Sequence, residues 1–343
     1  MPNICLSVSV NALQHNFRLL REKCTPCEVG AVVKANAYGL GVPIVVPALD
    51  AAGCRCFFVN RFAEGLEVRR HTAASVYVFD GLMDGETPED CRHYGLIPVF
   101  STFETLSRFP EEQDIAVRLD TGLNMAGLSV CDESRLEKAL SGRRVAFLMS
   151  HLSCAERPGD EKNVRQRRLF EKWAARFPTA RKSLAASYGI ALGESYWFDM
   201  VRSGASLYGA EILEGSRPAV RLSARVGWIE RYGAGESLGY NGAAVLKHPA
   251  TVATLLIGSG DGIVHREGCF VDYRGTLLPV LGTPTTNYLA VDASLVADRI
   301  APGDSMDLFS ETCTPDRLAR EIGETVGADF LIRLRESIPR RAV

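Results

Sequence analysis

The chain has 343 residues with a formal net charge of −2, and 46% of the residues are hydrophobic and 23% charged. This length favours two domains, and the composition is that of a globular protein in water. The balanced charge argues against nucleic acid or anionic lipid as a partner. Without a signal-like N-terminus or a bilayer-length apolar run, we expect a cytoplasmic protein with no membrane segment.

Up to about residue 216, short apolar runs alternate with segments of helical spacing, which is clearest in residues 161–177. Continuous apolar strands between amphipathic helices indicate a parallel sheet that helices cover on its outer face. Eight such units favour an α/β fold of the (β/α)8 or TIM barrel type over an open sheet. The predicted strands are residues 29–34, 56–60, 75–79, 96–100, 114–119, 145–150, 182–187 and 198–202.

From residue 217 onward the pattern changes to short strands separated by glycine turns, as in residues 225–246, 251–262 and 269–282. This pattern predicts a C-terminal, mostly β domain. The sequence therefore divides into a barrel domain, residues 8–216, and a β domain, residues 217–343.

Chemically active side chains follow several of the predicted barrel strands, where barrel enzymes build their active sites. Lys34 ends the first strand, His151 follows the sixth, and Ser187 ends the seventh. The loops after the last two strands commonly cradle a phosphate. Here they hold Ser187 and residues 202–205, whose backbone N–H groups can face an anion. A lysine amine opposite a phosphate cradle is the arrangement that covalent attachment of pyridoxal 5'-phosphate requires.

Each of these signals also has an ordinary structural interpretation. A lysine after a strand is usually a solvated loop charge. A lone His151 is more often hydrogen-bonded near the core edge, and Arg202 alone most often pairs with a carboxylate. The cysteine pairs in residues 24–27 and 54–56 do not share the spacing of a zinc site, so we expect no metal. Only the convergence of the polar residues on one rim favours a catalytic site.

The motifs resemble those of alanine racemase, a fold-type III pyridoxal phosphate enzyme, over essentially the whole chain. AVVKANAYGLG (31–41) resembles the cofactor-lysine motif, and LMSHLSCAE (148–156) the segment whose histidine lies against the pyridine ring. SLAASYGI (183–190) is similar to the phosphate-binding serine segment, and FDMVRSGASLYG (198–209) to the segment whose arginine faces the pyridine nitrogen. The resemblance implies that pyridoxal 5'-phosphate is bound by Lys34, Tyr38, His151, Ser187, Arg202, Gly204 and Ala205.

The resemblance also implies a mechanism and an assembly. GESLGYNG (235–242) resembles the segment that carries a tyrosine base, here Tyr240. Lys34 and Tyr240 would exchange the α-proton of an amino acid on opposite faces, which inverts the centre. A head-to-tail homodimer would share its active sites through Tyr240, and the N-terminal strand, residues 1–7, would belong to the β domain. Arg202 would keep the pyridine nitrogen unprotonated, and a cationic chain through His151 and Arg202 would stabilise the tyrosinate.

Several site positions depart from the family pattern. Arg118 replaces a lysine that is often carbamylated, and Met125 replaces the arginine that contacts the substrate carboxylate. Thr286 stands where the family has methionine, and Ala328 and Ser259 replace tyrosines, the first at the substrate entrance. We expect Arg118, Met125 and Thr286 to contact an amino acid larger than alanine, with Arg118 supplying the cation that Met125 lacks. The alternative is that Arg118 and Met125 merely repack a less active relative.

The leading hypothesis is an isomerase, a pyridoxal phosphate-dependent amino acid racemase, because both proposed bases, Lys34 and Tyr240, are present. The runner-up is a pyridoxal phosphate-dependent decarboxylase or retro-aldol lyase on the same scaffold, which the loss of the carboxylate-binding arginine favours. A third class is a non-enzymatic cofactor carrier, for which the second domain and Tyr240 would serve no purpose.

Overall fold

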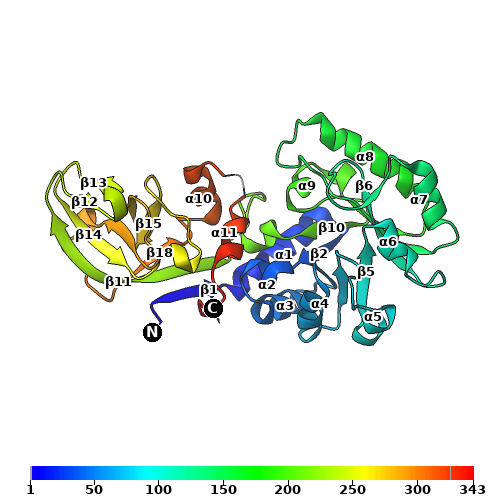
Figure 1. The fold of residues 1–343 in the computed structure, drawn as a ribbon, viewed down its shortest axis with the longest axis horizontal. Coiled ribbons are helices and arrows are strands. Elements are labelled where there is room, and N and C mark those ends of the chain that lie inside the picture. The colour runs from blue at the N-terminus through cyan, green and yellow to red at the C-terminus, as the bar shows by residue number, and fades with distance from the viewer. Residues whose placement is uncertain (1, 325) are drawn as a thin grey trace.

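The computed structural model describes residues 2–324 and 326–343. The molecule is elongated, with a barrel of strands and helices at one end and a mostly β domain at the other (Figure 1). The predicted fold class, a (β/α)8 barrel followed by a C-terminal mostly β domain, is confirmed.

Eight parallel strands form the barrel in the order β10-β2-β3-β4-β5-β6-β8-β9, and each matches one predicted strand. The short strand β7 (Leu128–Ser129) pairs beside β6. The ring is nearly closed, since isolated bridges join residues 183 and 198, and 186 and 202, next to β9 and β10. The strand bounds are β2 Glu28–Val32, β3 Cys56–Val59, β4 Ser75–Val78, β5 Leu96–Phe100, β6 Ile115–Asp120, β8 Val145–Met149, β9 Arg181–Ser183 and β10 Met200–Ser203.

Helices cover the outside of the barrel because each has one apolar face. In α8, for example, Phe170 and Trp173 are buried while the basic residues face outward. Polar side chains accept backbone N–H groups at several helix starts, as Ser9 does for α1 and Asp132 for α7. Within the described residues no helix is both long and apolar enough to cross a membrane. The helices are α1 Val10–Cys24, α3 Val42–Ala51, α4 Phe62–Arg69, α5 Pro88–Tyr94, α6 Phe103–Ser107, α7 Glu133–Leu140, α8 Glu161–Ala174 and α9 Ser187–Ala191.

A compact apolar cluster fills the barrel interior beneath the strand ends. Phe58 stacks on Tyr77 with ring centroids 4.9 Å apart, and Phe147 lies 4.9 Å from Tyr77. Offset aromatic pairs of this kind add stability beyond their buried area. Met149 and Val32 belong to this cluster and also line the cavity at the strand ends. The polar residues at the strand ends therefore lie next to a packed apolar interior.

The first barrel strand is shorter than predicted, because β2 ends at Val32 and a turn of left-handed helix follows it. The element α2 (Lys34–Tyr38) contains four consecutive non-glycine residues, 35–38, with φ between +51° and +54°. Each such residue costs roughly 1–2 kcal/mol relative to the right-handed conformation, so specific contacts must hold the turn. Asn36 Oδ1 accepts the Val42 N–H at 2.9 Å, and Glu64 Oε1 accepts the Ala35 N–H at 2.7 Å.

The second domain is an eight-stranded sheet in the order β14-β17-β16-β15-β18-β11-β1-β19, in which β14 also pairs with β11. The long strand β11 (Val220–Tyr232) pairs antiparallel with the N-terminal strand β1 (Ile4–Val8), which pairs parallel with β19 (Arg340–Ala342). The remaining strands are β12 Ser237–Leu238, β13 Ala244–Val245, β14 Ala250–Leu255, β15 Phe270–Tyr273, β16 Thr276–Leu281, β17 Leu289–Asp292 and β18 Ser305–Phe309.

Two helices near the C-terminus, α10 (Pro315–Ile322) and α11 (Ala328–Arg333), were not predicted. They lie between the sheet and the barrel in Figure 1. The backbone of α11 packs against the lysine turn, since a Cβ added to Gly39 would lie 2.2 Å from the Leu331 oxygen. The C-terminal segment also reaches this turn, because Arg340 Nε donates to the Gly39 oxygen at 2.9 Å. The two domains therefore meet directly behind α2.

Candidate active site

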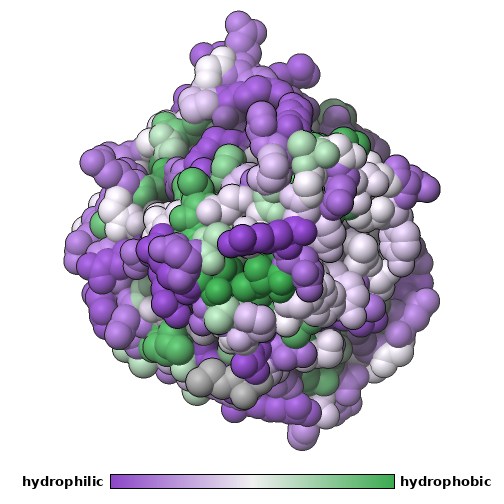
Figure 2. Space-filling model, turned by 90° about the vertical axis from the view of Figure 1, so that its left-hand side faces the viewer, coloured by the Kyte–Doolittle hydropathy of each residue, from purple (hydrophilic) through white to green (hydrophobic). Residues whose placement is uncertain are grey.

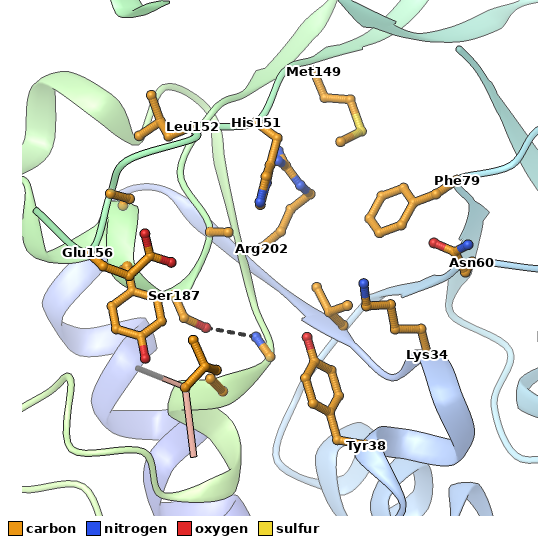
Figure 3. Close-up of a pocket in the computed structure, with 18 of the residues that line it drawn as sticks. Lys34, Tyr38, Asn60, Phe79, Met149, His151, Leu152, Glu156, Ser187 and Arg202 are labelled. Atoms are coloured by element: carbon orange, nitrogen blue, oxygen red, sulfur yellow. Dashed lines mark hydrogen bonds between the residues drawn. The ribbon is translucent and has the colours of Figure 1, made fainter. Parts of the chain in front are cut away.

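A cavity of about 280 Å³ opens at the C-terminal ends of the barrel strands. The Lys34 amine and the Tyr38 hydroxyl both point into it from the left-handed turn (Figure 3). Asn60 and Phe79 line the cavity from the ends of β3 and β4 (Figure 3). Its other lining residues are Val32, Arg118, Met149, His151, Leu152, Ala155, Glu156, Ala186, Ser187, Tyr188, Gly189, Arg202, Gly204, Ala205, Val326 and Asp329.

Ser187 and Gly204 form an anion cradle opposite Lys34. The Gly204 N–H donates to Ser187 Oγ at 3.0 Å, and the Ser206 N–H donates to the same oxygen at 3.3 Å. A Cβ at Gly204 would lie only 2.7 Å from Tyr38 Oη, so glycine is what lets this backbone approach the tyrosine hydroxyl. The Ser206 hydroxyl is buried and has no hydrogen-bond partner among the described residues. These donors around a glycine fit the phosphate of pyridoxal 5'-phosphate.

The Tyr38 hydroxyl faces the cradle as a neutral donor. Burial, and secondarily the charge of Asp329, raises the pKa of Tyr38 to about 12. Its ring packs against Tyr208 with centroids 5.0 Å apart, and the Tyr208 hydroxyl donates to the Val32 oxygen at 2.7 Å. The Tyr38 ring is thus fixed between the first and last units of the barrel.

Arg202 lies at the back of the cavity behind His151 (Figure 3). Its guanidinium donates to Ser183 Oγ at 2.5 Å and to the Ser150 oxygen at 2.6 Å. Burial, and then the charge of Arg118, lowers the pKa of Arg202 to about 9, so it remains a cation at neutral pH. Only neutral acceptors are among its partners, which leaves this charge without a carboxylate to compensate it in the described residues.

The low pKa of His151 argues against the positive charge that the expected cationic chain through His151 and Arg202 requires. Burial is the main cause, and the charges of Arg202, Arg118 and Lys34 add to it, lowering the pKa of His151 to about 3. A neutral imidazole can pack against an aromatic ring or share a hydrogen bond, but it contributes no positive charge.

Arg118, on β6, stands between the cavity and a neighbouring groove that Met125 also lines. Its Nε is buried and has no hydrogen-bond partner in the described part of the chain. Burial lowers the pKa of Arg118, and the carboxylates of Asp120 and Asp80 oppose this shift. The side chain therefore offers an unused cationic donor at the edge of the cavity.

Three predicted site residues lie outside the cavity lining. Tyr240 begins the 3₁₀ turn η3 (Tyr240–Gly242) of the β domain and is 78% exposed. Met125 is 86% exposed in the groove beside Arg118. Thr286 is exposed in a β-domain loop, where its carbonyl accepts the Gly260 N–H at 2.9 Å.

The structure adds cavity residues that the sequence did not single out. Asn60 follows its strand as Lys34 follows the first one, so its position alone could have indicated it. Its Nδ2 donates to both carboxylate oxygens of Asp80, at 2.9 and 3.0 Å, and burial raises the pKa of Asp80. Asp329 comes from the other domain, and no local pattern places it beside Tyr38.

A parallel barrel whose rim carries a lysine amine opposite a phosphate cradle defines a pyridoxal phosphate enzyme of the barrel class. Family models for "Alanine racemase, N-terminal domain" and "Alanine racemase, C-terminal domain" match residues 8–212 and 219–342. The chain belongs to the alanine racemase family. It is a pyridoxal phosphate-dependent racemase, and its relatives do not favour the decarboxylase or retro-aldol alternative.

Individual relatives match along nearly their whole length. The alanine racemase of Cereibacter sphaeroides strain ATCC 17025 is 34% identical over 353 residues, which cover 99% of this chain and 98% of the relative. The catabolic alanine racemase of Mesorhizobium japonicum is 33% identical over 346 residues, covering 96% and 90%. Among solved structures, alanine racemase from Bartonella henselae, with covalently bound pyridoxal phosphate, has a TM-score of 0.92 at 27% identity and full coverage of both chains. The biosynthetic alanine racemase from Pseudomonas aeruginosa has a TM-score of 0.91 at 26% identity and the same coverage.

Proposed function

We propose that this racemase interconverts L- and D-amino acids with two bases, Lys34 of one subunit and Tyr240 of a second. The observation that carries the proposal is the amine of Lys34, which points into a cavity opposite the Ser187–Gly204 cradle (Figure 3). The bound cofactor supplies an electron-withdrawing system that makes the α-proton of an attached amino acid acidic. Once the amino group of the substrate has replaced Lys34 on the cofactor, the released Lys34 amine would take or return that proton at one face of the α-carbon, and the Tyr240 oxygen would do so at the other.

Seven residues of this chain would hold the cofactor. Lys34 binds its aldehyde covalently, and Tyr38, Ser187, Gly204 and Ala205 bind its phosphate. His151 packs against the ring as a neutral imidazole. Arg202 would face the ring nitrogen, where its positive charge would keep that nitrogen unprotonated, limit electron withdrawal and favour brief proton exchange. The uncompensated charge of Arg202 and the Gly204 contact with Tyr38 both support this assignment.

The second base requires a head-to-tail homodimer. Tyr240 is 78% exposed on the β domain and does not line the cavity of its own subunit among the described residues. Figure 2 looks at the β-domain end of the molecule, where hydrophobic residues gather near the middle of the face and hydrophilic ones surround them. Exposed apolar patches of this kind mark contact surfaces. The exposed large apolar side chains of the β domain include Trp228, Tyr240, Val245, Tyr288 and Leu295.

For the substrate we propose an amino acid larger than alanine, held by its carboxylate on Arg118. The buried, unpartnered Nε of Arg118 supports this assignment. Ala328, expected at the substrate entrance, is buried and lines a separate small pocket, so it adds no support for a wide entrance. Met125 and Thr286 would contact the substrate only if the dimer brings their exposed loops to a cavity.

The remaining proposals concern location and domain limits. We propose a cytoplasmic enzyme with an amino acid as its small-molecule partner. We also propose domains of residues 8–216 and 217–343, with residues 1–7 counted in the second because β1 pairs with β11 and β19.

The reaction is tested by incubating the holoenzyme with a panel of L-amino acids in heavy water. Racemisation predicts α-deuterium in both enantiomers of at least one amino acid. An amine product would instead indicate decarboxylation, and a glycine fragment would indicate retro-aldol cleavage. Recovery of every amino acid without α-deuterium would refute the proposed function.

A further inference from the structure

We propose that Glu64, on α4 and outside the cavity lining, is the positioning residue for Lys34. This proposal rests on the proposed role of Lys34 as the cofactor-binding amine. The Glu64 carboxylate joins the left-handed turn that carries Lys34 to the end of the neighbouring strand β3. It does so through backbone groups, so it acts on the chemistry only through the residues it aligns.

Three backbone N–H groups converge on this one carboxylate. Glu64 Oε1 accepts the Ala35 N–H at 2.7 Å, directly after the lysine. Glu64 Oε2 accepts the N–H groups of Asn60 and Arg61 at 2.8 and 3.0 Å, where β3 passes into α4. Hydrogen bonds from N–H groups to a charged carboxylate are shorter and stronger than those between neutral groups. The carboxylate thus joins the backbone that follows Lys34 to the backbone at Asn60, beyond the last β2–β3 backbone bond, in which the Val33 N–H donates to the Phe58 oxygen at 2.8 Å.

Of the three hydrogen bonds, the one from the Ala35 N–H to Glu64 acts directly on the conformation of the turn. Residues 35–38 are not glycine and have φ of +51° to +54°, which such residues rarely adopt. Ala35 is the first of them, so its conformation decides the direction in which the turn leaves Lys34. With Ala35 released, the turn can relax toward the right-handed region, which moves the Lys34 amine and the Tyr38 hydroxyl away from the cradle.

Glutamine at position 64 would disrupt this arrangement without changing its size. Glutamine has an NH₂ group in place of one carboxylate oxygen. That NH₂ group cannot accept a hydrogen bond, and it would face a backbone N–H donor. Glu67 lies three residues after Glu64 on the same helix, and its carboxylate pairs with Arg70 and His71 near the surface. Glu67→Gln is therefore a matched control. Thr87→Ala, which removes the side-chain cap of α5, controls for a loss of helix capping alone.

The experiment measures the dissociation constant of pyridoxal 5'-phosphate by absorbance titration of the apoprotein, with urea unfolding of each variant alongside. Glu64→Gln should weaken cofactor binding at least tenfold, while Glu67→Gln and Thr87→Ala should change it less than twofold. Ala35→Gly supplies the decisive second variant, because glycine adopts positive φ without strain. In the Glu64→Gln background it should recover at least threefold of the lost affinity.

The possible results separate the two proposals. Wild-type affinity in Glu64→Gln, or no recovery on adding Ala35→Gly, would overturn the positioning role of Glu64. A Lys34→Ala variant that binds the cofactor as tightly as wild type would instead show that the proposed role of Lys34 is wrong. If Thr87→Ala lost as much affinity as Glu64→Gln, a loss of helix capping would explain the effect of Glu64→Gln. That result would also overturn the positioning role of Glu64.

Discussion

Replacing Gly204 by alanine tests whether the close approach of backbone and tyrosine builds the phosphate cradle. The new Cβ would lie 2.7 Å from Tyr38 Oη and 3.0 Å from Cζ, well inside ordinary contact distance. The Gly204 φ of −121° lies outside the left-handed region, so the main expected effect is the clash with Tyr38. Because Tyr208 packs on the Tyr38 ring, we expect the hydroxyl to be displaced from the cradle.

The magnitude follows from the hydrogen bond that is lost. A hydrogen bond to a charged group contributes about 1.5–3 kcal/mol, so Gly204→Ala should weaken pyridoxal 5'-phosphate binding roughly 10- to 150-fold. Tyr38→Phe removes the same hydroxyl and should lose a similar amount. The double variant should be no worse than either single variant, because both changes remove one interaction.

Absorbance titration of the apoprotein gives each dissociation constant. Gly159→Ala is the matched control, since no atom lies within 4 Å of its added Cβ. If the two losses multiply in the double variant, the hydroxyl and the glycine act independently and the reasoning is wrong. Wild-type affinity in Gly204→Ala would refute it more directly.

Three further predictions address the substrate, the assembly and stability. Arg118→Ala should raise the substrate KM at least tenfold with less than a threefold effect on cofactor affinity, and equal effects would count against carboxylate binding. Mixing and refolding Lys34→Ala with Tyr240→Phe should restore about one quarter of wild-type racemase activity, since about half the dimers are mixed and each has one intact site; no recovery would argue against shared sites. Burial lowers the pKa of His265 to about 4 from 6.5, so the unfolded chain takes up this proton first as the pH falls. The unfolding free energy should therefore drop by about 3 kcal/mol between pH 6.5 and 4, and His265→Leu should lack this loss in urea unfolding; the same pH dependence in both proteins would contradict the assignment.

The barrel could be predicted from the sequence because its strands are buried on both faces and read as continuous apolar runs. Residues 96–100 are a strand in the structure as predicted. The strand predicted at 182–187 is in fact only Arg181–Ser183, because Ser187 begins a helix whose first turn forms the cradle. Helix α10 had readable signals that were missed, with Thr314 as its cap, Pro315 in its first turn and Gly323 at its end.

From the sequence, only those site residues that belong to local motifs could be predicted. Lys34 and Tyr38 lie together in the cavity because they are four positions apart in one helical turn. Nothing in that motif signals a left-handed turn, since its stabilising partner Glu64 is 29 positions away. The pKa of His151 could not be predicted from the sequence either, because it depends on burial and on cations from three other strand ends.

The bond from Arg340 to the Gly39 oxygen has a consequence for how the protein is made. It joins residues 301 positions apart, and β19 pairs with β1 over a similar span. At about 5–20 residues per second, a ribosome needs roughly 15–60 s between these residues. The nascent barrel can collapse during that interval, but the lysine turn still lacks its contacts with α11 and Arg340. A newly synthesised chain therefore becomes competent to capture its coenzyme only late in its own translation.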